Sequence, residues 1–229
     1  MISIKDWEIV GWRHAVRGMR NPMNSWDKSD SKFVYSEWDA CTGVFEIGPN
    51  DLDLMKRLCQ GGEDDRKFMR MIVVYCDILA PLYWWKEFDT YKVGTVANSC
   101  STMHKIHAKE FTLDDFSHGH LVNDEFLYIS KNEGMWNENR FGDIPHQLLC
   151  TIIDCLNGAR ARYLETKDKK YWWQMIQMLP TSYNQKRTVM LNYEVLRNMY
   201  HARKNHKLDE WHDFCRWVES LPYSELIIG

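Results

Sequence analysis

The chain has 229 residues, a length that suits one folded domain. Its composition is 45% hydrophobic, 14% aromatic and 27% charged, which excludes a disordered or collagen-like chain. Lys plus Arg total 29 against 32 for Asp plus Glu, so the net charge of -3 gives no overall attraction to a nucleic-acid polymer or an acidic membrane. No apolar run approaches the roughly 20 residues that span a bilayer, and the amino terminus lacks a signal-peptide core. We therefore expect a cytoplasmic protein with no membrane partner and no nucleic-acid polymer as partner.

In chain order, the first half alternates short elements with polar turns. A strand and a helical turn are expected within Trp7–Arg20, and the Asn, Pro, Asp and Ser residues of Asn21–Ser31 predict a polar loop. A strand is expected within Tyr35–Ile47. A helix over Leu52–Cys59 follows, with Asn50 or Asp51 able to cap it.

The middle of the chain contains the most apolar strand candidate. Phe68–Leu79 becomes nearly continuous in apolar residues, which predicts a strand buried on both faces. Leu82–Phe88 then reads as the start of a helix, with Pro81 at or near its first turn. Thr90–Met103 is small and polar, which predicts an exposed loop. The segment 104–139 is a polar excursion with an expected short helix.

The last third is mainly helical. Apolar spacing predicts helices over Pro145–Thr166 and about Lys169–Met178, then a strand at Thr188–Leu191. Asn192 is well suited to cap a helix over Tyr193–Arg203, and an apolar stripe runs from Leu208 to Leu221. The fold class is therefore α/β (α+β), a single domain over 1–229 with a central β-sheet flanked by helices.

Standard chemical motifs are weak or missing. Cys100 with His104, His107, His118 and His120 offers a zinc alternative, but the spacing matches no standard site, so we predict no metal. A nucleophilic Cys100 beside His104 has no supporting flanking sequence. Glycine-loop phosphate motifs do not occur, which argues against a P-loop or Rossmann enzyme. The seven cysteines are odd in number and lack a Cys-x-x-Cys pair, which predicts reduced and mostly buried thiols.

Asn192 and Arg203 lie at the two ends of the helix in the last predicted strand-cap-helix unit. They lie 11 residues apart, about three helical turns or roughly 16 Å, on nearly the same face. They could hold the two ends of an elongated ligand. The structural alternative is that Asn192 only caps the helix and Arg203 only satisfies carbonyls at its carboxyl end.

The carboxyl-terminal pattern resembles that of the flavin-dependent thymidylate synthases. The residues that carry the resemblance are Leu179-Pro180, Asn192, Leu196, Asn198 and Ala202-Arg203. Upstream, Leu54–Phe88 with its Ala80-Pro81-Leu82-Tyr83 is similar to a family segment, and Ala15-Val16-Arg17 with Arg20 resembles an early arginine pair. The resemblance covers most of the chain and implies the fold of a thymidylate synthase-complementing protein.

The family's central motif is only partly present after Phe88. Lys92 stands for its second arginine and Thr95 for a serine, while Asn98 and Ser101 match after one extra residue. The first arginine, the histidine, the glutamate and the last arginine of the motif are absent. Lys92 keeps the charge but lacks the two-pronged hydrogen bonding of arginine.

The resemblance implies site roles for six residues. Arg203 would hold and polarise the uracil ring as the catalytic and substrate-binding residue, with Ser101 and Lys92 also binding substrate. Asn192, Asn198 and Asn98 would contact flavin.

The resemblance also implies an activity and an assembly. FAD would be the cofactor, NADPH and methylenetetrahydrofolate the co-substrates, a dUMP-like pyrimidine mononucleotide the substrate, and a homotetramer the assembly. Two alternatives stay open: a non-catalytic nucleotide-binding or assembly protein that lost flavin chemistry, and an enzyme that modifies another base in the same cavity. Trp84 and Trp85 are then expected at an interface or cavity wall.

Overall fold

The structure is a computed structural model that describes residues 2–36, 39–121, 130–132, 135–137 and 145–229. Its contacts gather into two compact units, which we describe separately. The first unit contains residues 1–79, 86–99 and 186–229, and the second contains 80–85 and 100–185. That the whole chain behaves as one domain stays a prediction. Part of the polar excursion over 104–139 lies outside the described residues.

The first unit is built on a four-stranded sheet in the order β1-β4-β8-β5. Its strands are β1 (Ser3–Val10), β4 (Val73–Pro81), β8 (Asn184–Asn192) and β5 (Val96–Ser99). The β1/β4 and β5/β8 pairs are antiparallel. The segment Thr90–Met103 was expected to be an exposed loop. Its residues 96–99 are exposed as expected but form the strand β5, which is held by its ladder to β8.

Burial alternates along β4, so the prediction of a strand buried on both faces was wrong. Val74, Cys76 and Ile78 are buried, while Tyr75 and Leu79 are 45% and 40% exposed. Successive side chains of a strand point to opposite faces, and helices cover only one face here. The strand also starts later than expected, because residues Asp65–Met71 form a 3₁₀ helix, η3.

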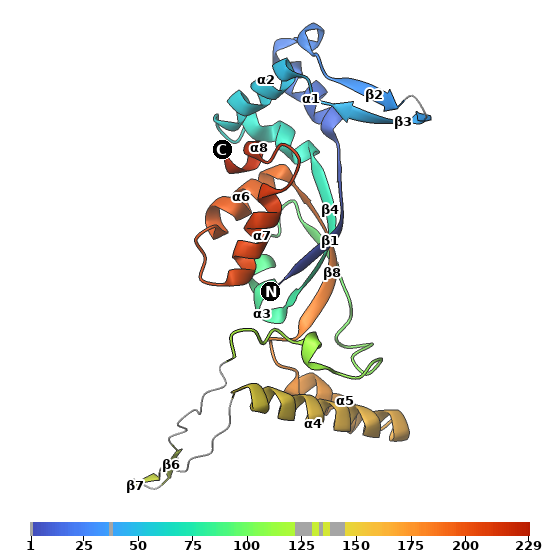
Figure 1. The fold of residues 1–229 in the computed structure, drawn as a ribbon, viewed down its shortest axis with the longest axis vertical. Coiled ribbons are helices and arrows are strands. Elements are labelled where there is room, and N and C mark those ends of the chain that lie inside the picture. Colours follow the sequence, from blue (N-terminus) through green and yellow to red (C-terminus); the bar gives the residue numbers. More distant parts are fainter. Residues whose placement is uncertain (1, 37–38, 122–129, 133–134, 138–144) are drawn as a thin grey trace. The chain divides into compact units, whose positions relative to one another are not determined.

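Helices pack on one side of this sheet (Figure 1). The helices assigned to this unit are α1 (Trp12–Arg20), α2 (Pro49–Cys59), α6 (Tyr193–Arg203), α7 (Asp209–Glu219) and α8 (Glu225–Ile228). α8 is too short for the sequence pattern to indicate, and it packs against α6 and α2. Figure 1 shows α6 and α7 beside the strands, and their buried side chains include Leu196, Met199, Trp211, Phe214 and Val218.

The strand and helix expected within Trp7–Arg20 are confirmed as β1 and α1. The polar loop is also confirmed, with two 3₁₀ turns, η1 (Asn21–Met23) and η2 (Trp26–Lys28). A hairpin of β2 (Lys32–Ser36) and β3 (Asp39–Glu46) replaces the single strand expected next.

The expected cap of α2 was wrong. Helix α2 begins at Pro49 after Gly48, so Asn50 and Asp51 lie inside its first turn. The carboxylate of Asp30, from the preceding loop, accepts the backbone N–H groups of Asn50 at 3.0 Å and Asp51 at 3.1 Å. A carboxylate distant in sequence thus does the work of a capping residue.

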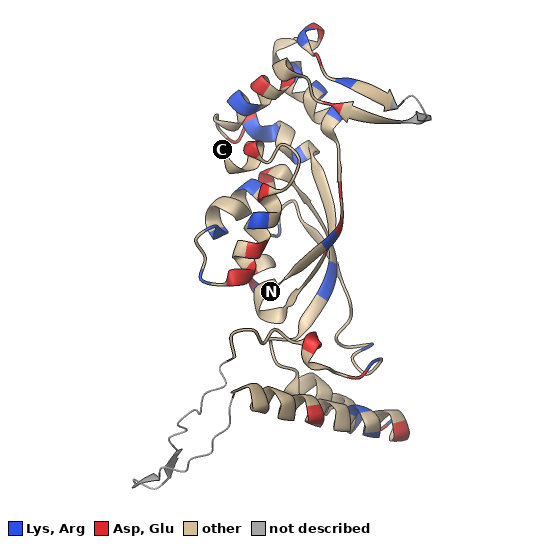
Figure 2. Ribbon diagram, in the orientation of Figure 1, with Lys and Arg blue, Asp and Glu red and all other residues tan. Residues whose placement is uncertain are grey.

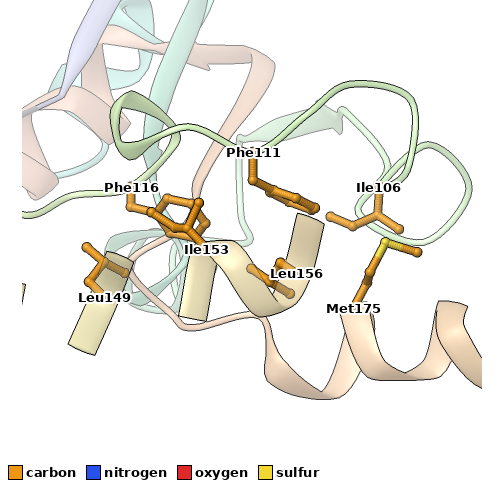
Figure 3. Close-up of a cluster of buried hydrophobic side chains, with 7 residues drawn as sticks. All are labelled: Ile106, Phe111, Phe116, Leu149, Ile153, Leu156 and Met175. Carbon is orange, nitrogen blue, oxygen red and sulfur yellow. The ribbon is translucent and has the colours of Figure 1, made fainter. Parts of the chain in front are cut away.

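The second unit is organised by two helices whose bounds match the prediction. These are α4 (Pro145–Thr166) and α5 (Lys169–Met178), the latter capped by Asp168, which accepts the N–H of Lys170 at 2.9 Å. The same unit includes the 3₁₀ turn η4 (Leu113–Asp115), where a short helix was expected, and a two-stranded ladder of β6 (Ser130–Asn132) and β7 (Met135–Asn137). Its apolar cluster is shown in Figure 3: Ile106, Phe111, Phe116, Leu149, Ile153, Leu156 and Met175.

Trp84 and Trp85 are completely buried, so their expected place at an interface or cavity wall was wrong. They belong to α3 (Leu82–Phe88), which contains residues of both units. The start of this helix was predicted, and the structure ends it at Phe88. The Trp85 indole N–H donates to the Gln185 carbonyl at 2.9 Å, which satisfies its polar atom without solvent.

The described cysteines are free thiols but are not mostly buried. Cys59, Cys76 and Cys215 are buried, whereas Cys100 and Cys155 are exposed. Burial raises the pKa of the Cys59 and Cys215 thiols to about 11 and that of Cys76 to about 12. These buried thiols are therefore protonated at neutral pH and are poor nucleophiles.

Both signs of charge are interspersed on the helices of the first unit (Figure 2), in keeping with the near balance of acids and bases in the sequence. Within the described ranges, no helix combines the length and apolar character that crossing a bilayer requires.

Candidate functional site

Arg203 lies at the carboxyl end of α6 with its guanidinium held by several groups. Nη1 donates to Glu87 Oε2 at 2.8 Å and Nε donates to the Tyr91 hydroxyl at 2.9 Å. The guanidinium carbon also lies 4.8 Å from the ring centroid of Trp211 and 5.5 Å from that of Tyr91. The alternative in which Arg203 only satisfies helix carbonyls is therefore not what the structure shows.

One edge of this guanidinium stays available. The side chain is 18% exposed, and Nη2 makes no hydrogen bond to the residues that the structure describes. An arginine presents five N–H donors in a rigid fork, and the Nη2 donors here can meet the carbonyl edge of a ligand.

A cavity of about 440 Å³ opens next to this group. It is lined by Phe88, Asp89, Tyr91, Lys92, Thr95 and Ala97. Its volume is in the range of about 300–1,000 Å³ that small-molecule sites occupy. Tyr91 both lines the cavity and bonds to Arg203, so the substrate-binding candidates Lys92 and Arg203 are brought to the same loop.

Lys92 is the available cation of this cavity. It is exposed and makes no hydrogen bond or ion pair to a described residue. The second guanidinium of this region, Arg187 on β8, is already paired with the cavity residue Asp89 at 2.7 Å, and its side chain is 13% exposed. The unpaired positive charge of the cavity is therefore that of Lys92, which would attract a phosphate group.

Asn192 caps α6, as the sequence predicted. Its Oδ1 accepts the N–H of Val195 at 3.0 Å. Gly94 approaches this cap closely: its φ is +77°, and a Cβ atom there would lie 2.9 Å from Val195 Cγ2 and 3.0 Å from Asn192 Nδ2. The loop that carries Lys92 is thereby fixed against the start of α6, because only glycine suits both the positive φ and the close approach.

The other three predicted residues have different surroundings. Asn98 on β5 pairs with Thr188 of β8, and Asn198 lies on α6; both are exposed, and neither side chain bonds to a described residue. Ser101 belongs to the second unit, where its hydroxyl accepts the N–H groups of Met103 at 3.2 Å and His104 at 2.9 Å. Their roles toward flavin and nucleotide stay predictions.

Sequence reasoning missed the residues that surround Arg203. Two of them, Glu87 and Tyr91, lie more than a hundred residues before Arg203 in the chain. The third, Trp211, is on the following helix, α7. Tyr91 lies next to Lys92, in the segment compared with the family motif. Of these three residues, it alone had a position in the sequence that could have suggested a place in the site. Glu87 and Trp211 give no such signal, since each looks like an ordinary helical residue.

The zinc alternative finds no support in the described part of the chain. No three His, Cys, Asp or Glu side chains among those residues gather closely enough to hold a metal ion.

Comparisons with known proteins identify the fold. No protein-family model and no curated protein sequence matches the chain. Two crystal structures of the flavin-dependent thymidylate synthase ThyX from Helicobacter pylori, both with FAD and dUMP, match with a TM-score of 0.64 and 15% identity. The matches cover 99% and 100% of this chain and 97% of ThyX. This chain has the ThyX fold.

A second kind of enzyme shares this fold. The UMP/dUMP methylase PolB from Streptomyces cacaoi, crystallised with 5-Br dUMP, matches with a TM-score of 0.56 and 13% identity over 99% of this chain and 94% of PolB. The resemblance to ThyX-type proteins seen in the carboxyl-terminal motif is thus confirmed at the level of the fold, as is the mixed α/β class. At these identities the similarity concerns the fold alone.

Proposed function

We propose that this protein binds a pyrimidine mononucleotide of the dUMP type in the cavity beside Tyr91 and Lys92 and transfers a one-carbon unit to its base. The observation that carries the proposal is Arg203, whose guanidinium is held by Glu87 and by Tyr91, a residue that lines the cavity, with its Nη2 donors available. The fold similarity supports the same ligand class, because ThyX and PolB were both crystallised with dUMP or its 5-bromo analogue.

The binding groups divide between the two ends of a nucleotide. Lys92 offers a positive charge to the phosphate. Arg203 offers hydrogen bonds to a base carbonyl. A guanidinium at that oxygen would stabilise negative charge that develops on the ring when a carbon nucleophile forms, which is electrostatic catalysis by a preorganised donor.

A flavin is compatible with the available amides. Asn98 and Asn198 are exposed and unbonded to described residues, so their donors and acceptors suit the polar edge of a flavin ring, while Asn192 Oδ1 is occupied by its cap. Bound FAD would supply hydride and one-carbon transfer chemistry, with NADPH and methylenetetrahydrofolate as co-substrates. The residues of this chain would bind and orient the nucleotide and hold the charge at Arg203.

Substitution of Arg203 by Ala tests the proposal. We expect Arg203→Ala to abolish dUMP binding measured by calorimetry, while the wild-type protein binds dUMP and raises its melting temperature with ligand concentration. Exposed Arg216, whose partner is Asp213 on the same helix, provides a matched control: Arg216→Ala should leave dUMP affinity unchanged. Unchanged binding in Arg203→Ala would overturn the assignment.

A non-catalytic nucleotide-binding protein is the second candidate, and one observation favours it. Arg203 and Arg187 are each neutralised by a carboxylate, Glu87 and Asp89, so the site carries less free positive charge than two arginines suggest. Loading with FAD separates the candidates. An enzyme retains a yellow flavin spectrum after gel filtration and forms dTMP from dUMP, methylenetetrahydrofolate and NADPH, whereas a binder elutes colourless and forms none. A methylated product from another pyrimidine nucleotide, and not from dUMP, would indicate the altered-substrate enzyme.

A further inference from the structure

Three nitrogen atoms converge on a single oxygen of Glu87. Its Oε2 lies 2.8 Å from Arg203 Nη1, 3.1 Å from the Trp211 indole nitrogen and 3.2 Å from His206 Nε2. These nitrogens come from the end of α6, from α7 and from the connection between them, while Glu87 itself is on α3. Two of these nitrogens, Arg203 Nη1 and Trp211 Nε1, donate hydrogen bonds to the oxygen, so Glu87 is held in one orientation.

The proton position on His206 follows from its other nitrogen. His206 Nδ1 accepts the backbone N–H of Leu208 at 3.1 Å. A ring nitrogen that accepts an N–H bond carries no proton, so the proton of the neutral ring is on Nε2, which faces Glu87. The N–H of His206 therefore faces Glu87, and the ring is itself oriented by the backbone of the α6–α7 connection.

Glu87 then determines where the Arg203 guanidinium points. The long arginine side chain has about 2 kcal/mol of rotamer entropy when free. Here the ion pair to Glu87 and the bond to Tyr91 restrain two of its three nitrogens, and the Trp211 and Tyr91 rings flank it. The restrained geometry is what leaves Nη2 as the remaining donor atom.

We infer that Glu87 is a positioning residue for Arg203, that His206 acts on Arg203 through Glu87, and that Trp211 acts both through Glu87 and through its own ring. The inference rests on the proposed function, because it assigns a purpose to the orientation of Arg203 toward a nucleotide. Glu87 need not touch the nucleotide for this role. Its carboxylate sets the direction of the guanidinium before the ligand arrives, which lowers the ordering cost of binding.

The test measures the orientation of Arg203 separately from ligand binding. Protein labelled with ¹⁵N-arginine gives an Nε–H signal for Arg203, assigned as the signal absent in Arg203→Lys. We expect Glu87→Gln to speed exchange of this N–H with solvent and to weaken dUMP binding, each by about tenfold, since bonds to charged groups are worth roughly that factor or more. His206→Ala, which removes the N–H that faces Glu87 and keeps the ion pair, should change both by about threefold.

The control is another carboxylate bonded to α6. Glu219 accepts the Tyr200 hydroxyl at 2.8 Å and does not touch Arg203, so Glu219→Gln should leave the Arg203 signal and dUMP affinity unchanged. If Arg203→Ala abolishes dUMP binding while Glu87→Gln and His206→Ala alter neither the signal nor the affinity, the positioning role is wrong. The positioning role is also wrong if Arg203→Ala abolishes dUMP binding while Glu87→Gln and His206→Ala change the Arg203 signal but not the affinity for dUMP. If instead Arg203→Ala leaves binding intact, the proposed function fails, and faster exchange in Glu87→Gln still supports the ion pair as the restraint on Arg203.

Discussion

Asp51 is the most completely buried charge of the first unit. Its side chain is 0% exposed and lies 2.6 Å from Arg20 Nε, and Oδ2 accepts bonds from the hydroxyls of Ser29 and Ser31. Removing one partner of a buried ion pair leaves an uncompensated charge and typically costs about 3–5 kcal/mol. We expect Asp51→Asn to lower the free energy of unfolding by about 3 kcal/mol in urea titrations. Asp53→Asn, at an exposed pair with Arg57, should change it by less than about 0.5 kcal/mol.

The same carboxylate predicts a pH dependence of stability. Burial raises the pKa of Asp51, but the bonds from Ser31, Ser29 and Arg20 outweigh burial and bring the pKa below its ordinary value of 3.8. Since the folded state holds the ionised form, its contribution is present above the ordinary value and is lost as pH falls through the lower folded-state pKa. The stability difference between wild type and Asp51→Asn should therefore be full at neutral pH and shrink below about pH 3.8. An unchanged difference in urea titrations at low pH would refute this.

Gly94 and Gly158 should respond oppositely to the same substitution. Gly94 has a φ of +77° and no room for a Cβ, whereas a Cβ at Gly158 on α4 would have no heavy atom within 4 Å. Gly94→Ala should destabilise by about 1–3 kcal/mol through backbone strain and the contact with Val195. Gly158→Ala should stabilise by about 0.5–1 kcal/mol, because alanine has the better helix propensity. Thermal melting of both variants checks the pair, and a loss of similar size in both would contradict the assignment.

At the scale of the element, substitutions of Asn192 and Asn198 distinguish a structural role in α6 from a ligand-binding role. Asn192 caps the helix through Val195 N–H, so Asn192→Ala should cost about 1 kcal/mol and Asn192→Asp should retain most of that stability. Asn198 is exposed on the same helix, so Asn198→Ala should leave the melting temperature unchanged. If Asn198 contacts flavin, its substitution lowers FAD retention without lowering stability. Equal effects of the two alanine variants on melting would show that the cap does not stabilise α6.

Elements whose signals are local were predicted from the sequence with their bounds, as α4, α5 and α6 demonstrate. Each has an apolar period, a cap or a proline that lies within the element itself. β5 and α8 were missed because they are short and depend on neighbours: a ladder to β8 in one case, packing on α6 in the other. The α2 cap failed for a similar reason, since its acceptor is Asp30 from an earlier loop.

At the scale of the whole molecule, the candidate site could be predicted only in part. Asn192 and Arg203 were singled out by capping chemistry and helical spacing, and Lys92 by the family pattern. Glu87 and Tyr91 were not, because their bonds to Arg203 close loops of 116 and 112 residues, and periodicity carries no information over such separations. The exposure of Tyr75 and Leu79 was missed because the sequence of an apolar strand does not show what covers its second face. Helices of the same chain and the surface of another molecule give the same apolar pattern.

That uncovered face gives the expected homotetramer a testable surface. On the sheet of the first unit, opposite the buried Val74, Cys76 and Ile78, the side chains of Tyr75, Leu79 and Val96 are 45%, 40% and 59% exposed. Apolar area of this kind favours association because burying it removes it from water.

Light scattering after gel filtration should give the mass of four chains of 27.4 kDa each. Tyr75→Glu should shift the protein to smaller species, because a carboxylate would be desolvated in the contact. Met23→Glu, at an 82% exposed loop residue away from the sheet, should leave the mass unchanged. A tetramer that persists in Tyr75→Glu would show that this face is not the contact, and a wild-type monomer would refute the assembly.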